Sequence, residues 1–176
     1  MSERSHQITC VVLRVVADPG HNGPLSEYRI DPDPAGYTIT LRISRIVPGL
    51  ERNPVPPPIT PPGWPRSRQA AEGNQLRTSS ITETLAKAPQ QVEAFLQKLA
   101  TELHVYELTD LKWSYPFLHP IFYTFSCQDS AGQSHRFEYQ IESSNHLDER
   151  YQRLIEEFNS FFESERVFKR FFASQR

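Results

Sequence analysis

The residues best suited to do chemistry in this sequence are Cys127 and His135. If the chain turns back around residues 130–131, the imidazole lies near the thiol and can favour a nucleophilic thiolate. The alternative is that Cys127 points into the core with Phe125 while His135 ends a strand in water. The sequence favours this inert alternative, because a catalytic thiol also needs a group that orients the base and donors that bind an oxyanion.

Other titratable residues lack the spacing of a metal or nucleotide site. None of the six histidines pairs with another at i, i+4. The two cysteines, Cys10 and Cys127, form no CxxC motif, so neither a metal nor another cofactor is predicted. Asp31 and Asp33 sit among prolines, where aspartate is typical of turns because its carboxylate accepts local backbone hydrogen bonds.

The least ordinary segment is dense in proline, with eight prolines between Pro48 and Pro65. Proline fixes φ and lacks an N–H, so this stretch favours polyproline II or an irregular loop. Several PxxP spacings and a tryptophan with nearby arginines suit an aromatic groove on a partner protein. The predicted partner-binding residues are Pro62, Trp64, Pro65, Arg66 and Arg68. The alternative is a stiff loop with Trp64 packed on the protein's own surface, since PxxP matches are unavoidable in such a sequence.

Alternation of apolar and polar residues predicts strands on both sides of this segment. Residues 7–17 are rich in valine on both faces, which indicates a strand covered on both sides. Residues 37–46 alternate strictly and predict a half-buried strand, with a shorter candidate at 28–30. Residues 121–128 and 136–142 also alternate, and the glycine-containing turn between them predicts a β-hairpin.

Helical periodicity predicts two amphipathic helices. The first spans residues 89–104, with Pro89 in its first turn, and the second spans 146–163. Residues 79–87 combine a capping-box pattern with β-prone composition, so strand and helix both stay open there. The aromatic residues of 167–172 either close the core or present a docking surface for a partner or a membrane.

This order of elements predicts an α+β fold. It reads β-β(-β), proline-rich segment, α, β-β(-β), α, which favours a mainly antiparallel sheet of four to six strands packed by two helices. Residues 1–47 offer strands but no helix, too little to bury both faces of the first strand. We therefore expect a single domain over residues 1–176, with the proline-rich excursion at 48–78 inside it.

Charge and composition narrow the function classes. The formal net charge is −2 and the isoelectric point about 6.3, so no global field attracts nucleic acid, and no nucleic-acid partner is predicted. We expect no signal peptide and no transmembrane segment, because the apolar runs are far shorter than the roughly 18 residues that span a bilayer. The expected location is the cytoplasm, with both cysteines reduced.

Two functions from different classes follow. The leading hypothesis is a non-enzymatic accessory or interaction module whose partner is another protein or a second copy in a homodimer. The alternative is a small-ligand-binding or enzymatic domain with a pocket between a curved sheet and the C-terminal helix. The residues predicted to line that pocket are Tyr37, Trp113, Tyr123, His135 and Tyr139. The sequence leans against an enzyme.

Overall fold

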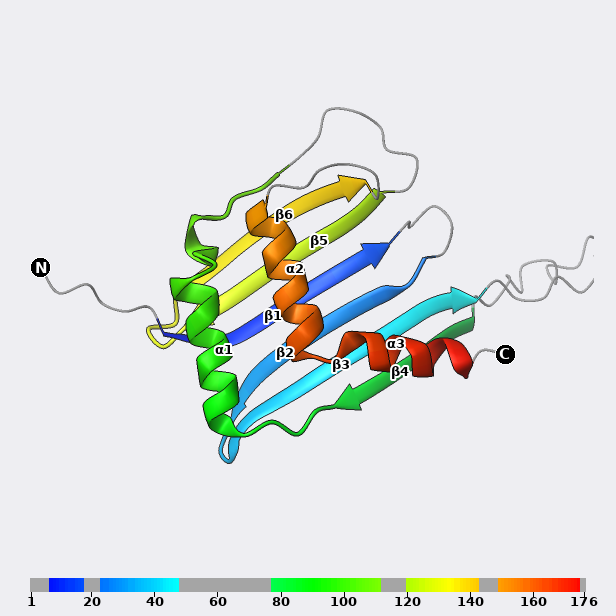
Figure 1. Ribbon diagram of the computed structural model, residues 1–176, viewed down its shortest axis with the longest axis horizontal. Helices are drawn as coiled ribbons and strands as arrows, with labels where there is room; N and C mark the ends of the chain where they lie inside the picture. Colours follow the sequence, from blue (N-terminus) through cyan, green and yellow to red (C-terminus); the bar gives the residue numbers. More distant parts are fainter. Residues whose placement is uncertain (1–6, 18–22, 48–76, 112–119, 143–148, 175–176) are drawn as a thin grey trace, which may run out of the picture.

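The computed structural model describes residues 7–17, 23–47, 77–111, 120–142 and 149–174. The described chain forms six strands, three α-helices and one short 3-10 helix (Figure 1). In chain order the elements are β1 (Ile8–Ala17), β2 (Leu25–Asp33), β3 (Gly36–Val47), β4 (Arg77–Thr84), α1 (Pro89–Thr101), η3 (Val105–Glu107), β5 (Pro120–Asp129), β6 (Ser134–Glu142), α2 (Glu149–Phe161) and α3 (Ser164–Ala173).

All six strands belong to one antiparallel sheet with the order β4-β3-β2-β1-β5-β6. The predicted α+β class with a mainly antiparallel sheet is therefore confirmed. Strands from both sides of the proline-rich segment pair within this sheet, and Val47 and Arg77 are directly opposite each other across β3 and β4. The chain thus leaves and re-enters the sheet at the same place. The five predicted partner-binding residues of that segment lie outside the described residues.

Local turn chemistry fixes two of the hairpins. Asp33 accepts hydrogen bonds from the Ala35 N–H at 2.6 Å and the Thr38 hydroxyl at 2.7 Å in the β2–β3 turn. Gly36 has a φ of +135°, a backbone conformation that would be strained in a residue with a side chain. In the predicted β5–β6 hairpin, buried Asp129 accepts from the N–H groups of Ala131 and Gln133. Both aspartates act as turn residues, as was expected of Asp33. The same expectation for Asp31 is wrong, because Asp31 lies within β2 and accepts a hydrogen bond from Arg29 at 2.9 Å.

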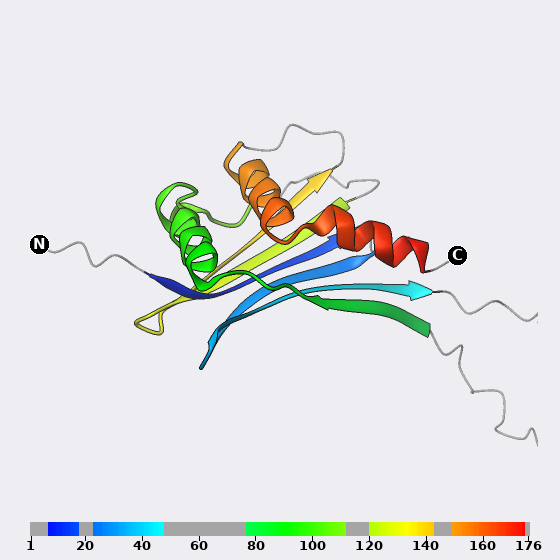
Figure 2. The same ribbon diagram turned by 60° about the horizontal axis from the view of Figure 1, so that its bottom comes forward.

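The three helices lie together on one face of the sheet (Figure 2). Phe158 of α2 is fully buried at the centre of this layer. Its ring lies edge-on to Phe95 of α1 at 5.3 Å and to Phe125 of β5 at 6.2 Å, measured between centroids. At the end of the chain, Phe171 is buried while Phe172 is 42% exposed, so α3 adds a third helix that closes the core with only part of its aromatic residues.

On the face of the sheet opposite the helices, the prediction that β1 is covered on both sides is wrong. Val12 is only half-buried there and Arg14 is exposed, and no described helix covers them. Arg14 instead pairs across strands with Glu27 at 2.7 Å. The valine-rich composition reflects the β-propensity of branched side chains and does not by itself require cover on both faces.

The two edge strands of the sheet, β6 and β4, differ in the hydrogen bonds that the described residues make on their outer sides. The outer edge of β6 is covered by Asp110 and Leu111. The Leu111 N–H donates to the Glu138 carbonyl at 2.9 Å, and the Gln140 N–H donates to the Leu111 carbonyl at 3.2 Å. The Asp110 carboxylate accepts from the Glu138 N–H at 2.9 Å. At the other edge, β4 pairs with β3 alone among the strands of the described chain.

Candidate functional site

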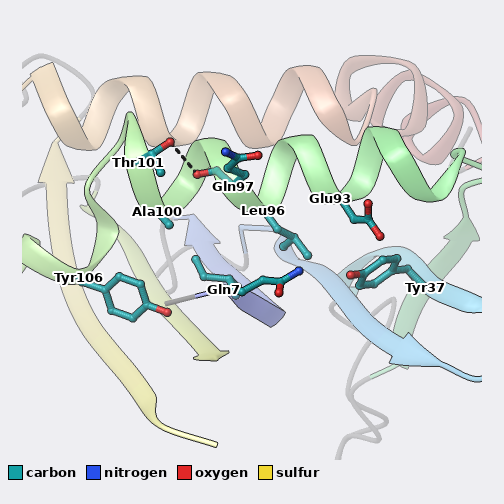
Figure 3. Close-up of a pocket in the computed structure, with 9 residues that line it drawn as sticks. Gln7, Tyr37, Glu93, Leu96, Gln97, Ala100, Thr101 and Tyr106 are labelled. Atoms are coloured by element: carbon teal, nitrogen blue, oxygen red, sulfur yellow. Dashed lines mark hydrogen bonds between the residues drawn. The ribbon is translucent and has the colours of Figure 1, made fainter. Parts of the chain in front are cut away.

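A groove of about 470 Å³ runs along one side of α1. It lies between that helix, the start of β1, the start of β3 and η3 (Figure 3). The lining residues come from these four elements and from the position just before β1, and are Gln7, Ile8, Tyr37, Glu93, Leu96, Gln97, Ala100, Thr101 and Tyr106.

Helical spacing places one row of α1 side chains along the groove. Glu93, Gln97 and Thr101 follow one another at i, i+4 and share a side of the helix. The buried side chains of α1, which include Leu96, hold the helix against the sheet. The helix starts at Pro89, and the Gln91 side chain accepts a hydrogen bond from the Ala88 N–H at 3.0 Å. These start signals fix where the helix begins, and its buried stripe on the sheet determines which side of α1 lines the groove.

The floor of the groove is apolar and its rim is polar. Ile8 and Leu96 are 1% and 2% exposed, and Ala100 is half-buried. Figure 3 shows Tyr37 and Tyr106 at opposite ends of the groove with Gln7 between them, and the Tyr37 hydroxyl points toward Gln7. The Tyr106 hydroxyl is buried beside the Cys127 thiol. The rim thus offers amide, hydroxyl and carboxylate groups around an apolar base, a combination suited to hydrogen bonding and partial apolar burial.

Cys127 and His135 lie directly opposite each other on β5 and β6, as a hairpin brings them. The His135 Nε2 atom lies 3.1 Å from the Leu108 carbonyl, so the ring is bonded to the backbone. Burial raises the pKa of the Cys127 thiol to about 11, although hydrogen bonds from Tyr106 and the His135 backbone lower it in part. The thiol is therefore neutral near pH 7, which favours the inert reading of this pair.

The aromatic residues predicted to line a pocket have different surroundings. Tyr37 lines the groove beside α1. Tyr123 and Tyr139 stack on each other across β5 and β6 with ring centroids 4.6 Å apart, and Tyr151 of α2 packs on Tyr139 at 4.8 Å. These rings belong to the core beneath α2. Trp113 lies outside the described residues.

His135 completes the predicted set and lies near the groove without lining it. Its ring centroid is 5.7 Å from that of Tyr106, which does line the groove. Sequence reasoning missed Gln7, Gln97 and Tyr106. The i, i+4 spacing along α1 was a usable signal for Gln97, but the other two come from separate elements and are brought there only by the fold.

No family model, curated protein or solved structure matches the chain. Within the described ranges, no three His, Cys, Asp or Glu side chains gather closely enough to hold a metal ion. None of the helices in the part of the chain that the structure describes is long and apolar enough to cross a membrane.

Proposed function

We propose that this protein is a non-enzymatic interaction module that holds a short segment of a partner protein in the groove beside α1. The observation that carries this proposal is the lining of the groove, an apolar floor bordered by hydrogen-bonding side chains. A peptide presents the complementary pattern, because its backbone amides alternate with side chains that seek apolar surface.

The rim supplies partners for a peptide backbone. The amides of Gln7 and Gln97 can both donate and accept, and the Tyr37 hydroxyl can do the same. The floor formed by Ile8, Leu96 and Ala100 accommodates an apolar side chain.

Glu93 adds a preference for charge. It is the one ionisable carboxylate in the lining, and its side chain lies on the exposed side of α1. A partner segment with a lysine or arginine beside an apolar residue is therefore favoured. Exposed ion pairs of this kind contribute at most about 1 kcal/mol and weaken as salt is added.

The proline-rich segment remains a proposed second contact with a partner. Its anchors are Pro62, Trp64, Pro65, Arg66 and Arg68. A variant lacking residues 51–72 tests this contact separately from the groove. Unchanged affinity for partners of the full chain would remove the segment from the proposal.

A small organic ligand is the second candidate occupant. The groove volume of about 470 Å³ falls in the range of roughly 300–1,000 Å³ usual for small-molecule sites. The same lining would bind an uncharged or cationic molecule with an apolar part.

Peptide selection on a displayed random library tests the proposal, with matched tryptophan variants on α1. Ala100→Trp fills the groove, while Ala94→Trp places the same side chain on the exposed face of the helix. We expect selected peptides to bind the wild type and Ala94→Trp alike and to lose about tenfold or more affinity for Ala100→Trp. Glu93→Gln should reduce both the affinity and its salt dependence for peptides with a basic residue.

Two results decide between the occupants. Equal peptide binding by Ala100→Trp and the wild type would refute the groove as the peptide site. A metabolite that raises the melting temperature of the wild type and of Ala94→Trp, but not of Ala100→Trp, with no peptide selected, would establish the small-ligand alternative.

A further inference from the structure

The outer edge of β4 carries a row of backbone groups directed away from the sheet. The Leu85 N–H donates to the Ile39 carbonyl at 2.9 Å, and these two residues continue the register of β3 and β4. In an antiparallel pair, hydrogen-bonded residues alternate with residues whose backbone groups point the other way. The backbone groups of Thr78, Ser80, Thr82 and Thr84 therefore point outward.

In the described part of the chain, this edge has few of the features that usually protect an edge strand, and its only charged residues are Arg77 and Glu83. Residues 77–84 contain neither lysine nor proline, which commonly blunt an exposed strand. The opposite edge, β6, is covered by the backbone of Leu111 and the Asp110 carboxylate. The hydrogen bonds of the described residues include no such cover on β4.

The one carboxylate on β4, Glu83, is already neutralised within the chain. It accepts hydrogen bonds from Arg166 at 2.6 Å and from Arg170 at 3.1 Å, and its side chain is 13% exposed. Both arginines belong to α3, which lies beside β4 on the helix face of the sheet (Figure 1). An inward carboxylate often discourages strand pairing. Here its charge is balanced in place, so it does not oppose a second strand.

The sequence of β4 is complementary to itself when the strand pairs antiparallel with a copy of itself. With the two-fold axis at Ile81, that residue lies opposite its own equivalent, and Ser79 lies opposite Glu83 of the second copy. The outward residues then meet in hydrogen-bonded pairs, Ser80 with Thr82 and Thr78 with Thr84. Apolar residue meets apolar residue, and no two like charges face each other.

We propose that β4 is a homodimer interface, at which two copies of this chain join their sheets edge to edge into one continuous sheet. The four outward residues of each strand supply about eight main-chain hydrogen bonds across the junction. The buried surface is small for a dimer, so association is weak and reversible. This interface is separate from the groove beside α1 and does not depend on the function proposed for the groove.

The first experiment removes one outward N–H. Thr82→Pro deletes that donor without touching the inward bonds to β3, and proline is tolerated on an edge strand with its nitrogen facing outward. Thr82→Ala is the matched control, because it loses the same side chain but keeps the N–H. Sedimentation velocity at about 1–200 µM covers the affinities expected of a weak interface. We expect a monomer–dimer equilibrium for the wild type, a dissociation constant within about twofold for Thr82→Ala, and one at least about tenfold higher for Thr82→Pro.

The second experiment tests the register and does not rely on the proline variant folding. In a Cys10→Ser background, Ile81→Cys places two thiols opposite each other at a Cα separation of about 4.5 Å, close enough for a disulfide. Thr84→Cys places its two copies about 20 Å apart. Mild oxidation should give a covalent dimer only with Ile81→Cys.

Three results would overturn the proposal. The first is a wild-type protein that stays monomeric over the whole concentration range, as it would if another segment of the same chain occupied the edge. The second is a dimer of equal strength in Thr82→Pro. The third is cross-linking by Thr84→Cys as fast as by Ile81→Cys.

Discussion

The reactivity of Cys127 gives a direct test of the chemistry assigned to the hairpin. Burial raises the pKa of this thiol from its ordinary value of 9.0 to about 11. At pH 8 the thiolate population is therefore about a hundredfold smaller than that of an ordinary thiol. Restricted access to a side chain that is 4% exposed slows its alkylation further.

The assay is alkylation by iodoacetamide followed by mass spectrometry, in a Cys10→Ser background so that one thiol remains. The rate should rise with pH up to about 11 and show no plateau near neutrality. In denaturing urea the rate at pH 8 should be at least about a hundredfold higher. His135→Gln is the informative variant. It should change the native rate by less than about twofold, because the imidazole is bonded to the Leu108 carbonyl.

An activated thiolate would behave in the opposite way. Its alkylation rate would level off below pH 8, exceed that of the unfolded chain, and fall when His135 is replaced. Any of these three results would refute the inference that the pair is inert and would reopen an enzymatic function.

Three further predictions concern stability, each measured from urea unfolding curves. Phe158→Ala should lower the free energy of unfolding by about 3–5 kcal/mol, whereas Phe172→Ala, at a 42% exposed site, should change it by less than about 1 kcal/mol; equal effects would contradict the packing of α2. Burial raises the pKa of Tyr28 and Tyr123 to about 12, so the folded state favours the neutral phenols, and the stability present below pH 10 should fall by about 2–3 kcal/mol for each tyrosine as pH rises from 10 to 12; a flat profile over that range would refute their burial. Glu83→Gln should cost about 1 kcal/mol at low salt and less at high salt, because it weakens the pairing with two exposed arginines of α3; a salt-independent loss would indicate a packing role instead.

Local sequence patterns were sufficient wherever one face of an element is buried. Strict alternation over residues 37–46 predicted β3, which spans Gly36–Val47. The pattern is informative because a shift by one residue would turn every apolar side chain of a strand to the wrong face. The β5–β6 hairpin was predictable for the same reason, with its turn closed by Asp129.

For residues 79–87, the local sequence was not sufficient to determine the secondary structure. Their composition suits a strand and their capping pattern suits a helix start, so propensity alone left both open. In the structure this stretch forms a strand, β4, because it pairs with β3, and Ile81 lies opposite Ile43. That pairing depends on residues almost forty positions earlier in the chain, and no local window contains them.

For the Cys127–His135 pair and for the α1 groove, the sequence likewise predicted one part of the arrangement and the tertiary structure determined the rest. The hairpin alone places the imidazole across from the thiol, so the sequence predicted their juxtaposition. Whether that juxtaposition activates the thiol depends on burial and on the Leu108 carbonyl, which belong to the tertiary structure. Likewise, the sequence determined that α1 has a polar row, but only the packing of β3 and η3 around this helix brings Tyr37 and Tyr106 to either end of it. The periodicity of a sequence indicates which face of an element is buried. The position of a site also depends on which other elements that face contacts, and periodicity does not give this.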